Sequence, residues 1–350
     1  MGKRVLMKGN EAMGEAAIRA GCEAYFGYPI TPQSELTAYM SKKMIEEDRV
    51  FVQAESEVAA INMVYGAGAA GKRTMTSSSS PGVSLKQEGI SYIAGARVPA
   101  VIINVQRGGP GLGNIAPAQG DYFQSTRGGG NGDYRLISLA PNSVQEMADF
   151  VMDAFELADK YRVPAIIVAD GMLGQMMEPV EFRDPVDVNS LPQKDWALNG
   201  KEGREQNVVH SLSLGGTGLM EHNEKLKKVY DKIEENEVKY DEMETEDAEI
   251  VIVSYGSASR ACIGAVRQLR EENKKVGLIR PQTLWPYPYD IVSKRAESAK
   301  KILVVEMSLG QMIDDVKIAA EGKADIDFLG KAGGWVPTKR EILDKVNELL

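Results

Sequence analysis

The chain has 350 residues, which is too long for one compact core, and a prior of about 150 residues per domain predicts two domains. Its hydrophobic fraction of 43% and charged fraction of 26% are those of an ordinary soluble globular protein. The net charge of -9 argues against a nucleic-acid-binding surface, and no apolar run reaches the roughly 18 residues that predict a membrane span.

The N-terminal segment indicates where in the cell the protein lies, and the cysteines indicate which disulfide and metal sites to expect. The first residues contain a glutamate, Glu11, and no long apolar core, so we expect no signal peptide and a cytoplasmic protein. The two cysteines, Cys22 and Cys262, lie far apart and neither belongs to a CxxC motif. We therefore expect two buried thiols, and no disulfide, zinc or iron–sulfur site on this chain.

The first elements are a helix over residues 14–21, which Gly21 stops, and a short strand over residues 23–27. The strand leads into YPITP at residues 28–32, where two prolines exclude a helix interior and stiffen the turn. Pro32 suits the first position of the next helix, with Thr31 as its N-cap. The alternative role for Thr31 is to present its hydroxyl to a ligand.

Residues 50–82 predict a strand, an alanine-rich helix, a second strand and a serine-rich loop that ends at Pro81-Gly82. The small residues between 59 and 70 let the helix pack close to a neighbouring backbone. Glu55 and Glu57 lie at its first turn, against the positive end of the helix dipole. Acids are common in the first turn of soluble helices, so this stretch alone allows either an ordinary helix start or a binding carboxylate.

A second helix over residues 82–95 is followed by an apolar run, residues 98–105, that suits a strand covered on both faces. The run ends at Arg107 and the glycine-rich loop GGPGLGN. Ligand sites in open α/β sheets lie beyond the carboxyl ends of the strands, so Arg107 is a candidate ligand-binding residue. The glycines are equally suited to simple turn formation.

Further strands at residues 135–140 and 163–169 flank a helix that begins with a capping box, Ser143 with Glu146. Strands that alternate with helices predict a parallel sheet with helices on both faces. We assign this first domain to residues 1–183.

Residues 184–247 predict a linker, because their composition is polar and mostly without periodicity. Its second part carries one apolar stripe at Leu226, Val229, Tyr230 and Ile233, which predicts a solvated helix between two domains. Strands at residues 249–253, 276–279 and 301–305 predict a small α/β domain over residues 248–350.

Three segments match part of a common motif but lack the neighbouring residues or elements that the motif requires. The GxGxxG match at residues 66–71 follows a helix and not a strand, which argues against a dinucleotide site and an NAD-dependent dehydrogenase. The glycine-rich loops at 108–113 and 215–218 lack the Lys-Ser/Thr of a phosphate-binding loop. His210 and His222 have no carboxylate at ligand spacing, so we expect no metal site.

Four motifs in order resemble the alpha subunit of the 2-oxoacid:ferredoxin oxidoreductases, in particular the branched-chain (2-ketoisovalerate) type. They are YPITP at 28–32, EVAA at 57–60, SSPG at 79–82 and VQRGGP at 105–110. Residues 249–309, with YGS at 255–257, RPQTLWP at 280–286 and VVE at 304–306, are similar to the C-terminal domain of transketolase-like enzymes. The resemblance implies an α/β protein: a thiamine-diphosphate-binding (pyrimidine-type) parallel-sheet domain followed by a transketolase C-terminal-like domain.

The resemblance also implies the site. Glu57 matches the glutamate that hydrogen-bonds the aminopyrimidine ring and favours the imino tautomer, whose imine removes the thiazolium proton; Glu55 is a neighbour. Arg107 would pair with the carboxylate of the 2-oxoacid, which a planar guanidinium fits well, and Thr31 would add a hydroxyl. The remaining residues implied in cofactor binding are Tyr28, Pro29, Ile30, Ser80, Pro81 and Gly82.

Two departures from the family pattern predict partner subunits. The GDG-type segment that holds diphosphate and Mg²⁺ is only approximated by Ala169-Asp170-Gly171, and two isolated cysteines cannot hold [4Fe-4S] clusters. We therefore expect half an active site here, with the diphosphate half and Mg²⁺ on a beta subunit, and clusters on gamma and ferredoxin-like iron–sulfur subunits.

The implied reaction is oxidative decarboxylation of a branched-chain 2-oxoacid, 3-methyl-2-oxobutanoate, with CoA to acyl-CoA, CO₂ and reduced ferredoxin. 2-Oxoglutarate and pyruvate remain alternative substrates, because no residue in the sequence defines the side-chain pocket. A non-catalytic assembly or regulatory subunit that has kept the fold is the alternative of another class.

Overall fold

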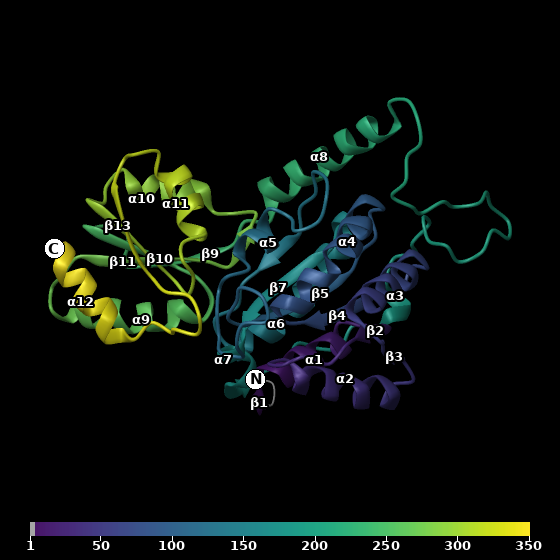
Figure 1. Ribbon diagram of the computed structural model, residues 1–350, viewed down its shortest axis with the longest axis horizontal. Helices are drawn as coiled ribbons and strands as arrows, with labels where there is room; N and C mark the ends of the chain where they lie inside the picture. Colours follow the sequence, from purple (N-terminus) through teal and green to yellow (C-terminus); the bar gives the residue numbers. More distant parts are fainter. Residues whose placement is uncertain (1–3) are drawn as a thin grey trace.

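The computed structural model describes residues 4–350, which form two sheets with helices packed on both faces of each (Figure 1). A seven-stranded sheet holds the N-terminal half, and a five-stranded sheet holds the C-terminal part. A separate antiparallel ribbon pairs β1 (Val5–Lys8) with β8 (Met177–Val180).

The seven-stranded sheet is parallel except at one edge, where β12 runs antiparallel to β6. Its strand order is β12-β6-β7-β5-β4-β2-β3. In chain order the strands are β2 (Ala24–Gly27), β3 (Val50–Gln53), β4 (Thr74–Ser78), β5 (Val101–Gln106), β6 (Ile137–Leu139), β7 (Ala165–Asp170) and β12 (Thr283–Trp285).

The central strand β5 separates two apolar cores. Val101, Ile103 and Val105 belong to one core, and Ile102 belongs to the other, as the two-residue period of a strand buried on both faces requires. This confirms the predicted sheet with helices on both sides. The helices are α1 (Gly9–Arg19), α2 (Ser34–Glu46) and α6 (Val144–Tyr161) on one face, and α3 (Glu57–Ala69) and α4 (Ser80–Gly95) on the other.

The five-stranded sheet has the order β14-β13-β10-β11-β9, and only β9 is antiparallel to its neighbour. Its strands are β9 (Tyr240–Met243), β10 (Ile250–Ser254), β11 (Val276–Pro281), β13 (Lys301–Glu306) and β14 (Asp325–Gly330). The helices α9 (Gly256–Glu271) and α12 (Lys339–Leu349) cover one face, and α10 (Tyr289–Ala296) and α11 (Met312–Ala320) cover the other.

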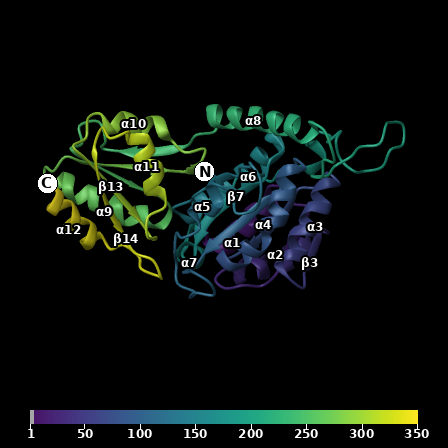
Figure 2. The same ribbon diagram turned by 45° about the horizontal axis from the view of Figure 1, so that its top comes forward.

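Helix α8 (Gly218–Asn236) runs along the first sheet toward the second, as the apolar stripe in the linker predicts (Figures 1 and 2). Leu226, Tyr230 and Ile233 are buried, and the Tyr230 ring meets Trp285 edge-on at 5.6 Å between centroids. A later part of the segment before α8 extends away from the body in Figure 1. Its start is held against the body, because the Val186 amide donates to the Arg19 carbonyl at 2.7 Å just before the short helix η1 (Val188–Ser190). None of the helices within residues 4–350 has the length and apolar character needed to cross a bilayer.

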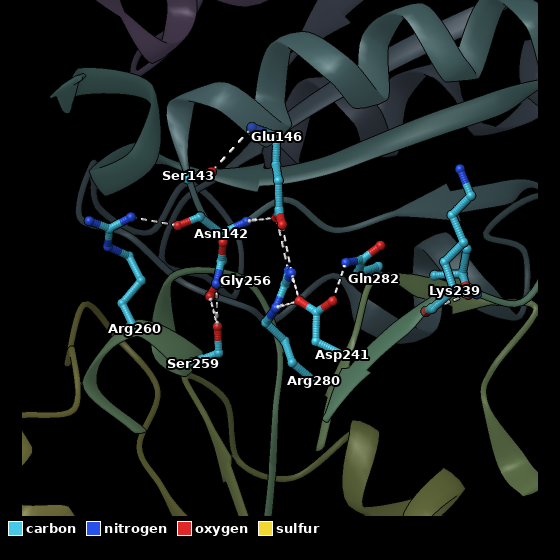
Figure 3. A network of polar contacts seen from close by, with 11 residues as sticks. Asn142, Ser143, Glu146, Lys239, Asp241, Gly256, Ser259, Arg260, Arg280 and Gln282 are labelled. Carbon is cyan, nitrogen blue, oxygen red and sulfur yellow. Dashed lines mark hydrogen bonds and ion pairs between the residues drawn. The ribbon is translucent and has the colours of Figure 1, made fainter. Parts of the chain in front are cut away.

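The two halves of the chain are fastened by a shared strand and by an ion-pair network. Strand β12 leaves the C-terminal half and pairs with β6 in the first sheet. Beside it, Arg280 on β11 donates to both carboxylate oxygens of Glu146 on α6, at 2.9 and 2.6 Å, and to Asp241 on β9 (Figure 3). Arg260 on α9 donates to the main-chain oxygen of Asn142 at 2.8 Å.

Two local predictions need correction. Helix α2 begins at Ser34 with Gln33 in the N-cap position, so the prediction that Thr31 caps it and Pro32 opens it is wrong. The Gln33 amide donates to the Ile30 carbonyl at 3.1 Å and closes a turn that keeps these residues outside the helix.

The capping box is only half formed. The Ser143 hydroxyl accepts from the Glu146 amide at 3.1 Å, as expected. The Glu146 carboxylate does not return to the Ser143 amide, because it accepts from the Asn142 amide and from Arg280.

Candidate functional site

The four sequence motifs meet at the carboxyl edge of the seven-stranded sheet. Residues 28–32 follow β2, residues 79–82 follow β4, and residues 107–113 follow β5. Because β4 lies between β2 and β5 in a parallel arrangement, these three loops are neighbours. The fourth motif, residues 57–60, opens α3. Ligands of open α/β sheets bind at this edge.

Glu57 and Gly82 approach each other at the starts of two helices. Glu57 is the first residue of α3 and only 6% exposed, and the Ser56 side chain caps the helix. A Cβ atom at Gly82 would lie 2.7 Å from Glu57 Oε1 and 2.1 Å from Ser78 Oγ, so only glycine leaves room for the carboxylate. Glu55 is exposed, whereas Glu57 is buried, so the two acids of this helix start lie in different environments, as the motif implied.

Arg107 lies next to Thr31, so the two residues expected to bind substrate are brought together. The guanidinium is 9% exposed and donates to the main-chain oxygens of Thr31 and Leu112, each at 3.0 Å. Within residues 4–350 no carboxylate forms an ion pair with Arg107, and its Nε has no acceptor. A buried cation without a counter-ion is costly, so this arrangement favours an anionic ligand.

Ser80 connects the Arg107 loop to the start of α4. Its hydroxyl accepts from the Arg107 amide at 3.1 Å and lies 2.5 Å from Asp121 Oδ2, which also accepts from Asn104 Nδ2 at 2.8 Å. Burial raises the pKa of the Asp121 carboxyl, while the bonds from Ser80 and Asn104 lower it. Asp121 lies just before α5 (Tyr122–Thr126). Through Ser80 it connects the start of α4 to the loop that begins at Arg107.

Several buried polar atoms along this edge have no partner within the described chain. They are the hydroxyls of Ser78 and Ser79, Nε2 of Gln33, Oδ1 of Asn104 and Nε of Arg107. Buried polar groups without hydrogen bonds are rare in folded proteins, so these five atoms support a polar binding site at this edge. The space kept open by Gly82 and these donors and acceptors fit a polar heterocyclic cofactor such as thiamine diphosphate.

The other residues expected to bind cofactor line the same edge. Tyr28 is 38% exposed, Pro29 is exposed and Ile30 is partly buried in the turn after β2. Pro81 occupies the first turn of α4, where its missing amide hydrogen costs nothing. Leu112, whose carbonyl binds Arg107, is 82% exposed.

Asp170 and His222, whose side chains are of types that bind metal ions in other proteins, make contacts within the protein. Asp170 Oδ1 accepts from the amides of Met172 and Leu173 and so caps α7 (Gly171–Gln175). His222 contacts the Gly95 carbonyl at 2.7 Å. Across residues 4–350 no group of three or more His, Cys, Asp or Glu side chains is placed to hold a metal ion.

Both cysteines are buried free thiols, as expected. Burial raises the pKa of the Cys22 and Cys262 thiols to about 12, so neither is a reactive thiolate near neutral pH.

Sequence reasoning missed four polar residues of this edge: Gln33, Lys86, Asn104 and Asp121. Asn104 carried a usable signal, since it interrupts an otherwise apolar strand run. Lys86 carried another, because it lies four residues after Gly82 and therefore on the same face of α4. Asp121 lies in an irregular stretch and gave no signal.

Comparison with known proteins agrees with this geometry. Residues 15–242 match the family model described as pyruvate flavodoxin/ferredoxin oxidoreductase, thiamine diP-binding, and residues 248–342 match pyruvate:ferredoxin oxidoreductase core domain II. The ketoisovalerate oxidoreductase subunit VorB of Methanothermobacter marburgensis is 53% identical over 98% of this chain and 97% of its own. The 2-oxoglutarate synthase subunit KorA of the same organism is 37% identical over 99% of both chains.

Solved structures give the same fold. The 2-oxoglutarate:ferredoxin oxidoreductase from Magnetococcus marinus, with 2-oxoglutarate, coenzyme A and succinyl-CoA bound, has a TM-score of 0.86 at 25% identity and covers 99% of this chain. The present chain spans 65% of that structure's chain. A split gene transketolase shares the fold at a TM-score of 0.57 and 13% identity.

These matches confirm the predicted α/β fold class and the relationship indicated by the four motifs. The chain belongs to the pyruvate flavodoxin/ferredoxin oxidoreductase family, whose thiamine-diphosphate-binding domain occupies residues 15–242.

Proposed function

We propose that this chain is the alpha subunit of a 2-oxoacid:ferredoxin oxidoreductase that converts 3-methyl-2-oxobutanoate and CoA to acyl-CoA, CO₂ and reduced ferredoxin. The observation that carries the proposal is the buried Glu57 carboxylate, held against Gly82 at the edge where the four motifs meet. The substrate class rests on relatives more than 50% identical that are named ketoisovalerate oxidoreductase subunits.

In this function Glu57 holds a proton at the cofactor. Thiamine diphosphate supplies a carbanion sink at its thiazolium ring when bound. Glu57 would hold a proton at the ring nitrogen of the aminopyrimidine, and its burial would strengthen that hydrogen bond because the surrounding dielectric is low. Gly82 keeps the space beside the carboxylate free.

Arg107 and Thr31 bind the carboxylate of the 2-oxoacid. The guanidinium already has two donors anchored on main-chain oxygens, and its unpaired Nε supports binding of an anion at this edge. Anchoring fixes the plane of the guanidinium before substrate arrives, which lowers the entropy lost on binding. The Thr31 side chain is on an exposed residue at the same turn.

The remaining cofactor contacts fall to the turns after β2 and β4. Tyr28, Pro29 and Ile30 form one wall of the site. Ser80, Pro81 and Gly82, the first three residues of α4, form the other wall. The free hydroxyls of Ser78 and Ser79 beside this second wall support a polar ligand.

The chain acts within a heteromeric complex. The relatives are named as subunits, and the site edge presents no acidic cluster for Mg²⁺ within residues 4–350. A beta subunit therefore supplies the diphosphate half with Mg²⁺, and gamma and ferredoxin-like subunits supply [4Fe-4S] clusters that pass electrons to ferredoxin.

The proposal has two alternatives, one of substrate and one of protein class. Relatives at 36–37% identity are named 2-oxoglutarate synthase subunits, so 2-oxoglutarate is the second candidate substrate, with pyruvate after it. A non-catalytic assembly or regulatory role is distinguished by whether the partner subunits are active without this chain.

The test is substrate-dependent viologen reduction by the purified complex. We expect kcat/KM for 3-methyl-2-oxobutanoate to exceed that for 2-oxoglutarate and pyruvate, with a strict requirement for CoA, added thiamine diphosphate and this chain. A higher kcat/KM for 2-oxoglutarate would move the assignment to the second substrate, and full activity of the partners alone would favour the assembly role.

A further inference from the structure

We infer that Gln119 is a positioning residue for Arg107. It fastens the end of the loop that carries Arg107 to the carboxyl edge of the five-stranded sheet, so the C-terminal half of the chain holds the substrate-binding guanidinium in place. The inference deepens the proposed function and rests on it for the role of Arg107. The hold on the loop is a property of the chain itself and is tested without substrate.

Gln119 bonds to Tyr255 and Met307 through both its main chain and its side chain. The Gln119 amide donates to the Met307 carbonyl at 2.9 Å, and the Met307 amide donates to Gln119 Oε1 at 2.9 Å. Gln119 Nε2 donates to the Tyr255 carbonyl at 2.9 Å, and the Tyr255 hydroxyl donates to the Gln119 carbonyl at 3.3 Å. Gln119 is 1% exposed, so loss of these bonds would leave buried polar groups unpaired.

The contact lies at the switch point of the five-stranded sheet. The chain passes from β10 to β11 on one side of β10 and then to β13 on the other side. Tyr255 follows β10 and Met307 follows β13. Ligands of open α/β sheets usually bind at such a point, beyond the carboxyl ends of the strands. Here a side chain from the first half of the chain occupies it, so the second sheet holds a loop of the first.

A short series of hydrogen bonds leads from Gln119 to Arg107. Asp121, two residues after Gln119, accepts from the Ser80 hydroxyl at 2.5 Å, and its amide donates to Gln106 Oε1 at 3.0 Å. Gln106 directly precedes Arg107, and Ser80 Oγ accepts from the Arg107 amide at 3.1 Å. A displacement of Gln119 would therefore disturb both supports of the Arg107 main chain.

The loop that follows Arg107 is closed at its base. The Gly108 amide donates to the Ala116 carbonyl at 2.9 Å, which brings the two ends of the loop together. Asn114 Nδ2, on the same loop, donates to the Gly333 carbonyl of the C-terminal half at 3.0 Å. A misplacement of about 1 Å in a substrate-positioning group can cost on the order of 100-fold in rate, so a hold on one end of this loop matters for the other.

The first test is hydrogen exchange of the assembled complex without substrate, read by mass spectrometry on peptides that span residues 107–118. Gln119→Met keeps the length of the side chain but removes its donor and its acceptor. We expect exchange in these peptides to become faster by on the order of tenfold, the effect of losing one or two net hydrogen bonds. Unchanged exchange in Gln119→Met would overturn the inference.

The second test separates positioning from stability by steady-state viologen reduction. In Gln119→Met we expect KM for the 2-oxoacid to rise on the order of tenfold with a smaller change in kcat, because the guanidinium is less ordered before substrate arrives. Arg280→Met is the matched control, because Arg280 joins the two halves through Glu146 and, within residues 4–350, bonds to no residue of the Arg107 loop. It should lower stability and leave KM unchanged. An equal rise of KM in both variants would contradict a specific role for Gln119.

A variant on the other side of the contact leaves Gln119 itself intact. Gly256 has a φ of 55°, and the Cβ atom of Gly256→Ala would lie 2.9 Å from Gln119 Nε2, so KM should rise as in Gln119→Met. Gly322→Ala is its control, since Gly322 has a φ of 76° but a Cβ atom there meets no atom within 4 Å. Both variants strain the backbone, but only Gly256→Ala should raise KM. An unchanged KM in Gly256→Ala, or an equal rise in Gly322→Ala, would count against the inference.

The two readouts distinguish this inference from the proposed function. Loop exchange does not depend on the substrate, so faster exchange in Gln119→Met would support the hold on the loop even if the complex used no 2-oxoacid. If the complex oxidises 3-methyl-2-oxobutanoate and Gln119→Met changes neither loop exchange nor KM, the proposed function stands and the inference fails.

Discussion

Arg107 donates from Nη1 to the main-chain oxygen of Thr31 at 3.0 Å and so joins two loops that lie 76 residues apart in the chain. The contact fixes the guanidinium at the edge of the sheet, beside the start of α4. It uses main-chain groups on the Thr31 side, which leaves the Thr31 hydroxyl available to a ligand.

Replacing Arg107 by lysine should weaken substrate binding. A lysine keeps the positive charge but loses the planar pair of donors, and charge-assisted hydrogen bonds contribute about 1.5–3 kcal/mol each. We expect the KM for the 2-oxoacid to rise roughly ten- to a hundredfold with a smaller change in kcat. Steady-state viologen reduction measures this, and Arg135→Lys is the matched control. An unchanged KM in Arg107→Lys would remove Arg107 from the substrate site.

Replacing Gly82 by alanine should displace Glu57. The new Cβ would meet Glu57 Oε1 at 2.7 Å and Ser78 Oγ at 2.1 Å, and overpacking of this kind costs about 1–3 kcal/mol. We expect lower thermal stability and weaker thiamine diphosphate binding, measured by thermal unfolding and by calorimetric titration of the complex.

Gly66→Ala is the control, because a Cβ atom at that position meets no atom within 4 Å. Gly66 lies within α3, where alanine is the better helix former, so this variant should be neutral or more stable by about 0.5–1 kcal/mol. Equal losses in both variants would show that the space beside Glu57 is not special.

Removing Arg280 should loosen the junction between the two sheets. Its side chain is 4% exposed and contacts Glu146 and Asp241, which are 21% and 53% exposed (Figure 3). Because solvent screens these carboxylates in part, the loss should be smaller than the about 3–5 kcal/mol of a fully buried ion pair. We expect Arg280→Met to lower the melting temperature clearly. Arg340→Met, which removes a pair that is 83% exposed on the arginine side, should change it little. Similar melting temperatures for the two variants would argue against an energetic role for the junction.

Lys86 should make stability depend on pH in a defined direction. Its pKa is lowered to about 7, so between pH 7 and the ordinary lysine range the unfolded chain binds more protons than the folded chain. The cost of the buried charge is therefore largest below pH 7 and falls as pH rises, by at most about 1.4 kcal/mol per pH unit. Lys86→Met should be the more stable protein at pH 6, and its advantage should shrink by pH 9 in thermal unfolding.

The polar segment before α8 should be the first site of proteolysis. Val208, Leu212 and Leu214 are 63–85% exposed, and the segment extends from the body (Figure 1). The division of the chain at residues 183/184 and 247/248 remains a prediction that this experiment addresses. We expect early cleavage within residues 184–217, with the fragments held together by β12 and Arg280. First cleavage inside either sheet would contradict the division.

The sequence was sufficient to predict the strands and helices whose apolar residues recur with a regular period. The apolar runs that became β5 and β7 and the stripe on α8 follow the periods of a strand and a helix, and the structure confirms them. Strand β12 could not be predicted, because three residues give no period and its partner β6 lies in the other half of the chain. The turn at Thr31 was misjudged because a local capping rule cannot include the Gln33–Ile30 hydrogen bond.

The same limit applies to the site. Motif order predicts binding roles for Glu57, Thr31, Arg107 and Gly82, and these roles stay predictions; the structure places Arg107 beside Thr31 and Gly82 beside Glu57. Asp121 was missed because it acts on Ser80 across 41 residues and follows no periodic element. Such contacts depend on how loops meet in space, which a local pattern does not encode.

We propose that Glu57, and not its neighbour Glu55, exchanges a proton with bound thiamine diphosphate. The most direct measurement is viologen reduction by complexes that carry Glu57→Gln or Glu55→Gln, with cofactor binding measured on the same samples. We expect Glu57→Gln to assemble but to lose at least about 100-fold in kcat, since the amide keeps the size but cannot exchange the proton. Glu55→Gln should match the wild type, and wild-type turnover in Glu57→Gln would contradict a proton-exchanging role for Glu57.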